Sequence, residues 1–310
     1  MRLLMLGAGG VGGYFGGRLH EGGADVTFLV RPKRAAILRE RGLRIYGVRG
    51  ELQIKAPKLL VGGENAEQSF DAVIVSCKAY DLDSSIEAIR PYVGPQTLVL
   101  PLLNGIKHLD TLDAAFGDQR VLGGLAQVSS TIDANGDIKQ FTDVQSMVYG
   151  ARSESQHTGV EALDRALKQG NFDARLSRSI QLEMWEKFTL LTSLAAMTCL
   201  MRANVGEIAA TQDGAQLMSR MLDDCAATAK AAGHTPRDKY MMSIRGVLTQ
   251  KGSLLEASMR RDMEGGNATE ADHVVGDMLR RATAAGIEAT LLRAAYCHLQ
   301  AHELRRHIKM

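Results

Sequence analysis

The sequence predicts an α/β fold in which a doubly wound parallel sheet is followed by an all-α C-terminal domain. Over the first 150 residues, short apolar runs alternate with stretches of helical spacing, as in consecutive βαβ units. From about Ile180 onward, strand-like alternation is absent and one helical pattern follows another. A glycine motif, G-x-G-x-x-G, stands between the first apolar run and the first helical stretch.

The expected elements can be placed by residue number. Two hairpin-like insertions, turning at Arg49-Gly50 and at Asn135-Gly136, are expected to be antiparallel and peripheral, with the Asn-Gly pair supplying positive φ angles. Phe172–Leu176 still has the pattern of a strand and Gln181 opens a long amphipathic helix, so the boundary is set at Arg178, giving domains 1–178 and 179–310. The parallel strands are expected at Arg2–Leu6, Asp25–Val30, Ala72–Ser76 and Thr97–Leu100, and the helices between them at Gly10–Gly22, Pro32–Arg41 and Leu82–Arg90.

Composition excludes several classes of protein. The chain has 310 residues and a net charge of +2, which supports neither a nucleic-acid nor a membrane partner. Its four cysteines form no C-x-x-C pair, and no apolar stretch is long enough for a signal peptide or a membrane span, so we expect a cytoplasmic protein with reduced thiols. His298 and His302 lie four apart on a helix, but no third ligand accompanies them and no metal is expected.

The segment Gly7-Ala8-Gly9-Gly10-Val11-Gly12 follows an apolar strand and opens a helix, which is the context of a dinucleotide-binding loop in a Rossmann-type sheet. Gly7 permits a tight turn, Gly9 lets the backbone approach a pyrophosphate, and Gly12 allows close packing. The free N–H groups and dipole of the helix N-terminus favour the same anion. The alternative is a glycine-rich turn that has no ligand.

Three polar residues follow the ends of neighbouring strands, where ligands bind in open α/β sheets. Arg31 stands where an NAD enzyme usually has Asp or Glu, and its charge suits the 2′-phosphate of NADPH, as the weaker candidates Lys33 and Arg34 would. Lys78 and Asn104 are expected to face the same crevice. Each has an ordinary alternative: a solvated basic strand end, a surface lysine or a turn-forming asparagine.

Reduction of a carbonyl also needs a proton donor, and Lys187 lies in the apolar sequence that opens the second domain, where burial would lower its pKa. Together with the glycine motif, these residues make the chain resemble the ketopantoate reductases over essentially its whole length. The motifs that carry the resemblance are GAGGVG, Arg31, Cys77-Lys78-Ala79, Leu103-Asn104-Gly105, Trp185-x-Lys187, Ser258 and Thr269-Glu270-x-Asp272.

The resemblance implies a reaction and the roles of several residues. The reaction is reduction of 2-dehydropantoate (ketopantoate) to (R)-pantoate by NADPH, a step of pantothenate biosynthesis. Lys187 would be the proton donor, Asn104 would hold substrate and nicotinamide, and Ser258 would bind the substrate carboxylate. Glu270 and the backbone of Ser130 would contact the cofactor. Without the resemblance, Ser258 would be interpreted as a hydroxyl on a helix surface, and Glu270 as a residue that helps to cap a helix.

One departure from the family concerns the substrate. The family carries asparagines four and eight residues after the lysine, and both help to bind substrate, whereas this chain has Leu191 and Ala195. A more apolar wall favours a 2-oxo acid with a larger hydrophobic side chain, which is the first alternative. The others are an NADPH-binding sensor without turnover and a hydroxy-acid dehydrogenase working in the oxidative direction. The helical domain could pair two copies into a homodimer, but no residue identifies the face.

Overall fold

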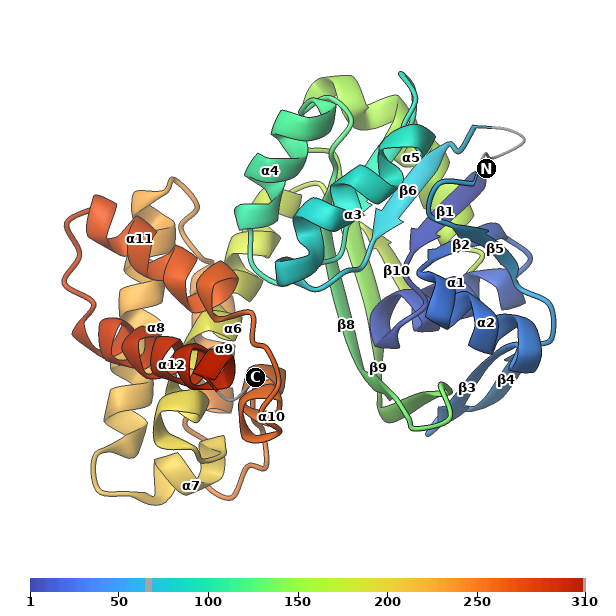
Figure 1. Ribbon diagram of the computed structural model, residues 1–310. Coiled ribbons are helices and arrows are strands. Elements are labelled where there is room, and N and C mark those ends of the chain that lie inside the picture. The colour runs from blue at the N-terminus through green and yellow to red at the C-terminus, as the bar shows by residue number, and fades with distance from the viewer. Residues whose placement is uncertain (65–68, 309–310) are drawn as a thin grey trace. The chain divides into compact units, whose positions relative to one another are not determined.

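The computed structural model describes residues 1–64 and 69–308 (Figure 1). The chain divides into two compact units. The sheet unit comprises Met1–Leu103 and His108–Ile180, and the helical unit comprises Asn104–Lys107 and Gln181–Met310. Residues 309 and 310, the end of the predicted helical domain, lie outside the described range. The short segment Asn104–Lys107 therefore belongs with the helical unit, although it lies within the sequence of the sheet unit.

The centre of the sheet unit is a five-stranded parallel sheet with the strand order β5-β2-β1-β6-β7. All four predicted parallel strands are present, and the predicted Rossmann-type fold is confirmed. The edge strand β5 was not anticipated, because its four residues are too few and too exposed to give a strand pattern. The strands are β1 (Arg2–Leu6), β2 (Asp25–Val30), β5 (Lys58–Val61), β6 (Ala72–Val75) and β7 (Leu98–Pro101).

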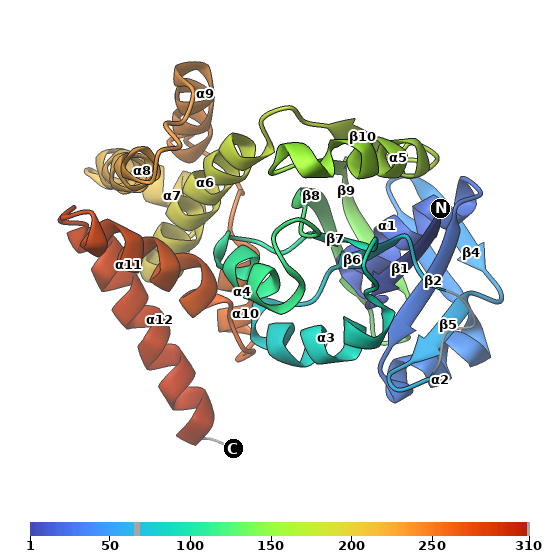
Figure 2. The same cartoon turned by 90° about the horizontal axis from the view of Figure 1, so that it is seen from above.

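Side chains alternate between two apolar cores on the two faces of this sheet. In β1, Leu3 and Met5 pack on the side of α1 and α5, whereas Leu4 and Leu6 pack on the side of α3 and α4. Figure 2 shows α3 and α5 on opposite sides of the strands. Burial on both faces explains why β1 reads as a continuous apolar run. The helices are α1 (Gly10–Glu21), α2 (Pro32–Arg41), α3 (Leu82–Ile89), α4 (Lys107–Phe116) and α5 (His157–Leu167).

The two predicted hairpins are antiparallel, but they join a second five-stranded sheet and are not peripheral additions. Ile45, Ile138 and Tyr149 from this sheet are fully buried in the same core as α1. The long ribbon of β8 and β9 is the most extended part of the sheet (Figure 1). The strands are β3 (Leu43–Gly47), β4 (Gly50–Ile54), β8 (Gly123–Ile132), β9 (Ile138–Gly150) and β10 (Asp173–Leu176).

The turn between β8 and β9 differs from the prediction in its backbone. Only Gly136 has a positive φ angle (86°), and Asn135 does not. The carboxylate of Asp133 accepts hydrogen bonds from the N–H groups of Asn135 and Asp137, both at 2.9 Å. The connection is therefore a longer loop that is stabilised by the side chain of Asp133. It is not a two-residue turn, which would require two positive φ angles.

The helical unit is built around α6, which carries the most apolar late stretch of the sequence, Leu190 to Met201, a stretch too short for a membrane span and expected from the sequence to be a buried helix. The expectation that this helix is amphipathic was wrong, because the consecutive residues 192–199 are all buried and together they face every side of the helix. In the described part of the chain, every helix is too short or too polar to cross a bilayer. The helices are α6 (Ile180–Met201), α7 (Val205–Ala210), α8 (Gly214–Ala231), α9 (Asp238–Leu248), α10 (Ser258–Glu264), α11 (Asp277–Ala284) and α12 (Thr290–Ile308), with a π-helical turn, η4 (Asp272–Gly276), leading into α11.

Candidate cofactor cavity and catalytic lysine

The glycine loop between β1 and α1 is tightly packed. Gly7 adopts a positive φ of 87°, and its N–H donates to the carbonyl of Leu29 on β2 (2.9 Å). A Cβ atom on Gly12 would lie 2.2 Å from Oγ of Ser76 and 2.5 Å from the carbonyl oxygen of Gly7. Larger residues would clash at Gly12 and would be strained at Gly7. These two glycines thus have the backbone roles predicted for a dinucleotide-binding loop.

The N-terminus of α1 is open where a ligand would approach. Gly9 occupies the N-cap position, so no side chain caps the helix, and the atom nearest to a Cβ placed there would be Cδ1 of Ile132 at 3.9 Å. The hydroxyl of Ser130 on β8 donates to the carbonyl of Gly10 (2.8 Å), which places Ser130 directly against the loop. Uncapped N–H groups and the helix dipole give this end a preference for anions.

A cavity of about 580 Å³ lies beyond the carboxyl ends of the central strands. Its wall is formed by the loop residues Gly7, Ala8 and Gly9, the end of β2 with Arg31, and Asp81 at the start of α3. Pockets of this size hold small-molecule ligands, and carboxyl ends of strands are the usual place for them in such sheets. The cavity and the uncapped helix therefore fit the pyrophosphate and adenosine parts of a dinucleotide.

Arg31 forms an ion pair that the sequence did not reveal. Its Nη2 lies 2.8 Å from Oδ1 of Asp81, and this hydrogen bond raises the pKa of the guanidinium. The side chain is still 72% exposed. Asp81 puts a negative charge next to the proposed phosphate-binding cation, so a 2′-phosphate would compete with Asp81 for Arg31.

The other basic candidates of this region have different positions. Arg34 is turned onto the glycine loop, where its Nε and Nη2 donate to the carbonyl of Ala8 (3.1 and 2.8 Å) and its Nη1 to that of Gly136 (2.6 Å). It therefore fixes the loop to the β8–β9 turn. Lys78 is exposed at the end of the segment that follows β6.

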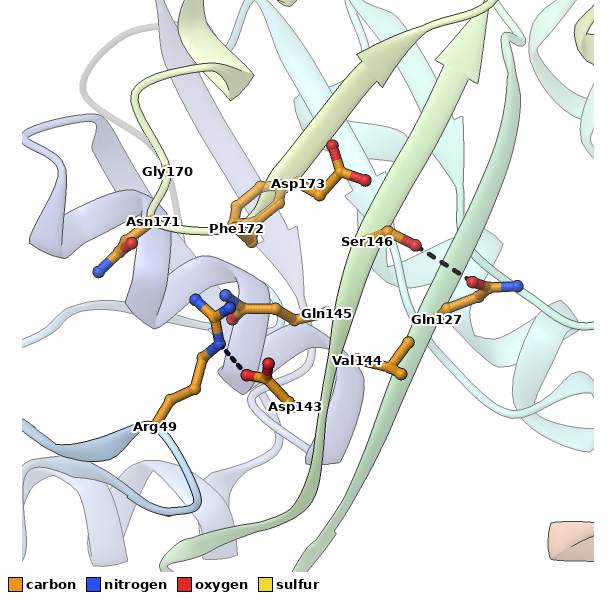
Figure 3. Close-up of a pocket in the computed structure, with 10 residues that line it drawn as sticks. All are labelled: Arg49, Gln127, Asp143, Val144, Gln145, Ser146, Gly170, Asn171, Phe172 and Asp173. Atoms are coloured by element: carbon orange, nitrogen blue, oxygen red, sulfur yellow. Dashed lines mark hydrogen bonds and ion pairs between the residues drawn. The ribbon is translucent and has the colours of Figure 1, made fainter. Parts of the chain in front are cut away.

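A second hollow in the sheet unit, of about 550 Å³, has no residue in common with this cavity. It lies on the second sheet beside the β9–β10 edge. Figure 3 shows Arg49 directed at Asp143, with which it forms an ion pair, and Ser146 bonded to Gln127 at 3.3 Å. Since these groups pair with one another, the hollow carries no candidate chemistry.

Lys187 lies in the helical unit, about two turns into α6. Its side chain is half-buried, and burial lowers the pKa of the ammonium group to about 8, although the negative charge of Glu270 acts in the opposite direction. The preceding residue, Glu186, is buried and accepts hydrogen bonds from the backbone N–H (2.9 Å) and the guanidinium of Arg237. These bonds fix the rotation of α6 and hence the direction of Lys187.

Glu270 comes just before the π-helical turn η4 and is only 8% exposed. Turns of this kind are frequent at functional sites, because the inserted residue redirects neighbouring side chains. The first residue of the turn, Asp272, accepts hydrogen bonds from Lys107 (3.0 Å), Arg280 (2.8 Å) and Tyr296 (2.7 Å). Burial alone would raise the pKa of Asp272, but these bonds outweigh it and hold the pKa well below its usual range.

The Lys107–Asp272 pair brings the segment of Asn104 to the helical unit. Gly105 adopts a positive φ of 79°, and a Cβ on it would lie only 3.1 Å from Cδ2 of His273. His273 is buried, which lowers its pKa, and it feels the charges of Glu270 and Lys107. Lys107 and His273 were missed in the sequence, because contacts across some 165 residues leave no local pattern.

Ser258 is the first residue of α10, and its side chain is exposed. The preceding residue, Ala257, is buried, and its N–H donates to Oγ1 of Thr198 on α6 (3.4 Å). This bond ties the start of α10 to the helix of Lys187. The predicted role of Ser258 in binding a carboxylate stays a prediction.

The two positions that depart from the family lie on α6 beyond Lys187. Leu191 is half-buried and Ala195 is 4% exposed. The neighbouring hydroxyls do not replace the amides: Ser193 donates to the carbonyl of Thr189 (2.8 Å), and Thr192 is fully buried with no partner for its hydroxyl among the described residues. This part of α6 is therefore apolar at the two positions where the family has amides.

Comparison with known proteins gives a consistent result over the whole chain. Family models match for ketopantoate reductase PanE/ApbA over residues 3–154 and for the C-terminal part of the same family over residues 179–303. An uncharacterized oxidoreductase of Bacillus subtilis, YkpB, is 34% identical over 99% of this chain and 100% of its own length. A 2-dehydropantoate 2-reductase of Lactococcus lactis is 26% identical over 74% of each chain.

Solved structures share the fold. A D-mandelate dehydrogenase crystallised with NADH and anilino(oxo)acetate superposes with a TM-score of 0.88 at 20% identity, over 99% of this chain and 100% of that one. A 2-dehydropantoate 2-reductase of Geobacter metallireducens gives 0.87 at 24% identity, over 97% and 99% of the two chains. At these identities the likeness concerns the fold alone.

Proposed function

Because the chain belongs to the ketopantoate reductase family of oxidoreductases, as its motifs predicted, we propose that it reduces a 2-oxo acid to the 2-hydroxy acid with NADPH. The first candidate reaction is the conversion of ketopantoate to (R)-pantoate in pantothenate biosynthesis. The cytoplasmic location and the homodimer expected from the sequence stay predictions.

The observation that carries the proposal is the environment of Lys187. An amine whose pKa is lowered to about 8 is still mostly protonated at neutral pH and gives up its proton readily, as a general acid must. The charge of Glu270 stabilises the protonated form. Burial of an ammonium group is unfavourable for folding, which favours a functional role for this lysine.

The glycine loop, the uncapped start of α1 and the adjoining cavity would hold the cofactor. Bound there, a nicotinamide nucleotide supplies the hydride that reduces the carbonyl carbon. Arg31 supports NADPH, because an arginine can bind the 2′-phosphate through charge-assisted hydrogen bonds, although Asp81 competes for it.

The residues of the helical unit would act on the substrate. Lys187 donates its proton to the carbonyl oxygen as negative charge develops there, and Asn104 donates a hydrogen bond to the substrate. The negative charge of Glu270 favours the protonated form of Lys187. Ser258, at the start of α10, would bind the substrate carboxylate.

Leu191 and Ala195 favour a second candidate substrate, a 2-oxo acid with a larger hydrophobic side chain. Each good hydrogen bond to a charged group contributes about 1.5–3 kcal/mol, so the loss of two amides weakens binding of the polar ends of ketopantoate. An apolar wall instead gains from contact with an apolar substituent. The D-mandelate dehydrogenase that shares this fold acts, by its name, on an aromatic 2-hydroxy acid.

Steady-state assays with NADPH test the proposal. We would follow the absorbance of NADPH with ketopantoate, branched-chain 2-oxo acids and phenylglyoxylate, and follow the reverse reaction with the corresponding hydroxy acids and NADP⁺. Turnover of ketopantoate with the highest kcat/KM would support the first candidate. Preference for an apolar 2-oxo acid would support the second, and NADPH binding without any turnover would refute an enzymatic role in favour of a sensor.

Reduction should slow as the pH rises above about 8. Lys187 must be protonated to donate, and burial lowers its pKa to about 8, so each further pH unit removes about tenfold of the active form. Plots of kcat/KM against pH from 6 to 10 would measure this pKa in the free enzyme. A rate that stays constant up to pH 10 would contradict the role of Lys187.

Replacing Arg31 by alanine should weaken NADPH selectively. The lost charge-assisted bond corresponds to an increase of about 10-fold or more in the KM for NADPH, with little change for NADH. Lys55→Ala, which removes an exposed cation of the sheet unit outside the cavity, is the matched control. Asp81→Asn should have the opposite effect, because it releases Arg31 from its ion pair. Equal changes for both cofactors in Arg31→Ala would refute recognition of the 2′-phosphate by this residue.

A further inference from the structure

The helical unit contains a cavity of about 420 Å³ that the proposed reaction does not use. It is bounded by the end of α6, the end of α10 with the loop that follows it, and the C-terminal half of α12. None of the described residues that line it is a predicted catalytic, substrate-binding or cofactor-binding residue. Its size lies within the range of small-molecule pockets.

Basic side chains from two separate elements meet at this cavity. His298, His302, Arg305 and Arg306 follow one another at spacings that place them on one face of α12. Arg202 joins them from the end of α6. The pair of histidines noted in the sequence is therefore part of a cationic cluster, and the described residues include no group of three side chains that could hold a metal ion.

Some members of the cluster are fixed by the loop after α10. The Nε2–H of His302 donates to the carbonyl of Asn267 (3.1 Å), and Nε of Arg306 donates to that of Gly266 (3.1 Å). Arg306 also pairs with Glu303 at 2.6 Å. These bonds give the cavity a defined wall.

The positive charges of Arg202 and Arg305 are not paired with an acidic side chain in the described part of the chain. Among the described residues, neither Arg202 nor Arg305 forms an ion pair, and Nε of Arg305 donates only to the carbonyl of Ala301 (3.1 Å). The acidic side chain in the cavity wall, Glu264, is bound by Arg260 at 3.1 Å. Two positive charges are thus left without a carboxylate in a hollow of small-molecule size.

Arg202 follows the last residue of α6 and ends that helix in the left-handed conformation. Its φ angle is +51°, and among the described residues it is the sole non-glycine residue with a positive φ. The N–H of Ala203 donates to the carbonyl of Thr198 (3.3 Å), which is the hydrogen bond of a Schellman C-cap, a position that usually holds glycine. A cation there complements the dipole of α6, so the inference rests on the convergence of Arg202 with the basic face of α12.

The pKa of His298 also indicates that the cations of this cavity lie close together. Burial lowers its pKa, and the positive charges of Arg305, Arg202 and His302 lower it further. The cations are therefore close enough to one another to repel an additional charge. A bound anion would relieve this repulsion.

We propose that this cavity binds a small molecule that carries a phosphate group, with Arg202 and Arg305 as the principal contacts and His298 and His302 beside them. Two unpaired guanidinium groups match a phosphate dianion in charge and in their forked geometry. The remaining volume leaves room for the organic part of a phosphate ester. The site is independent of the proposed reductase reaction.

The test uses the full-length protein and inorganic pyrophosphate as the probe, with binding measured by isothermal titration calorimetry. NADPH is present in excess, so that the glycine loop does not contribute. The cavity variant is Arg202→Gly combined with Arg305→Gln, and Arg202→Gly also relieves the strained backbone, so the variant should remain folded. Arg293→Gln removes an exposed cation of α12 outside the cavity and is the matched control.

We expect wild type and the control to bind pyrophosphate equally and the cavity variant to bind it at least about tenfold more weakly, the equivalent of one lost charge-assisted contact. In NMR titrations, the pKa of His298 should rise when pyrophosphate is bound. Absence of binding at millimolar probe, or equal binding by the cavity variant with an unchanged melting curve, would overturn the proposal.

Discussion

Replacing Lys187 by alanine is expected to lower kcat for 2-oxo acid reduction by about 10²-fold or more, which is the usual contribution of a positioned general acid. NADPH affinity should not change, because the glycine loop and its cavity belong to the sheet unit. Single-turnover rates and fluorescence titration of NADPH would separate the two effects. Lys239→Ala, which removes an exposed lysine of α9, serves as the control.

A stability measurement distinguishes a chemical role of Lys187 from a structural one. Because burial lowers the pKa of this lysine in the folded state, the ammonium form is less favourable there than in the unfolded chain, and it lowers stability at neutral pH. The Lys187→Met variant has an unbranched side chain of similar length but no charge. It should therefore be inactive and melt at a higher temperature. A variant that is inactive and also less stable would contradict this view of the site.

The second large effect is expected from restoring the two amides of the family. Leu191→Asn combined with Ala195→Asn should raise kcat/KM for ketopantoate relative to an apolar 2-oxo acid by about 10-fold or more per effective hydrogen bond. The measurement is the ratio of kcat/KM for ketopantoate and phenylglyoxylate in each variant. The ratio, rather than either rate, reports substrate preference.

Ala195 is buried, so a larger side chain there also changes packing, which typically costs about 1–3 kcal/mol. Ala195→Leu adds similar volume without an amide and is the matched control for size. If it shifts the ratio as much as the double variant does, shape and not hydrogen bonding selects the substrate. An unchanged ratio in both variants would show that this face of α6 does not contact the substrate.

The parts of the fold that could be predicted are those with local signals. The strand before the glycine motif, the motif itself and α1 follow from apolar periodicity and from glycines whose conformations no other residue adopts easily. The second sheet could not be predicted, because its parallel pairing of Ile45 with Ile138 joins residues far apart in the chain. The pairing of strands that are far apart in the chain cannot be predicted from a local pattern of residues.

The same division applies to the candidate site. Lys187 and Arg31 could be singled out from sequence context, but their electrostatic partners could not. The pairing of Arg31 with Asp81 spans 50 residues, and it changes how strongly Arg31 can attract a phosphate. The environment of the polar residues of α6 was also invisible, because the sequence does not show that the hydroxyl of Ser193 turns back to the carbonyl of Thr189 or that Thr192 is fully buried.

The assignment of Asn104–Lys107 to the helical unit bears on how this protein can be recombined with its relatives. A chimera joined at residue 178 would exchange Asp272 without exchanging Lys107, its ion-pair partner at 3.0 Å. It would likewise separate His273 from Gly105, whose lack of a side chain makes room for it. A transplant of the helical half is therefore complete only if it carries a four-residue insertion from the other half of the gene.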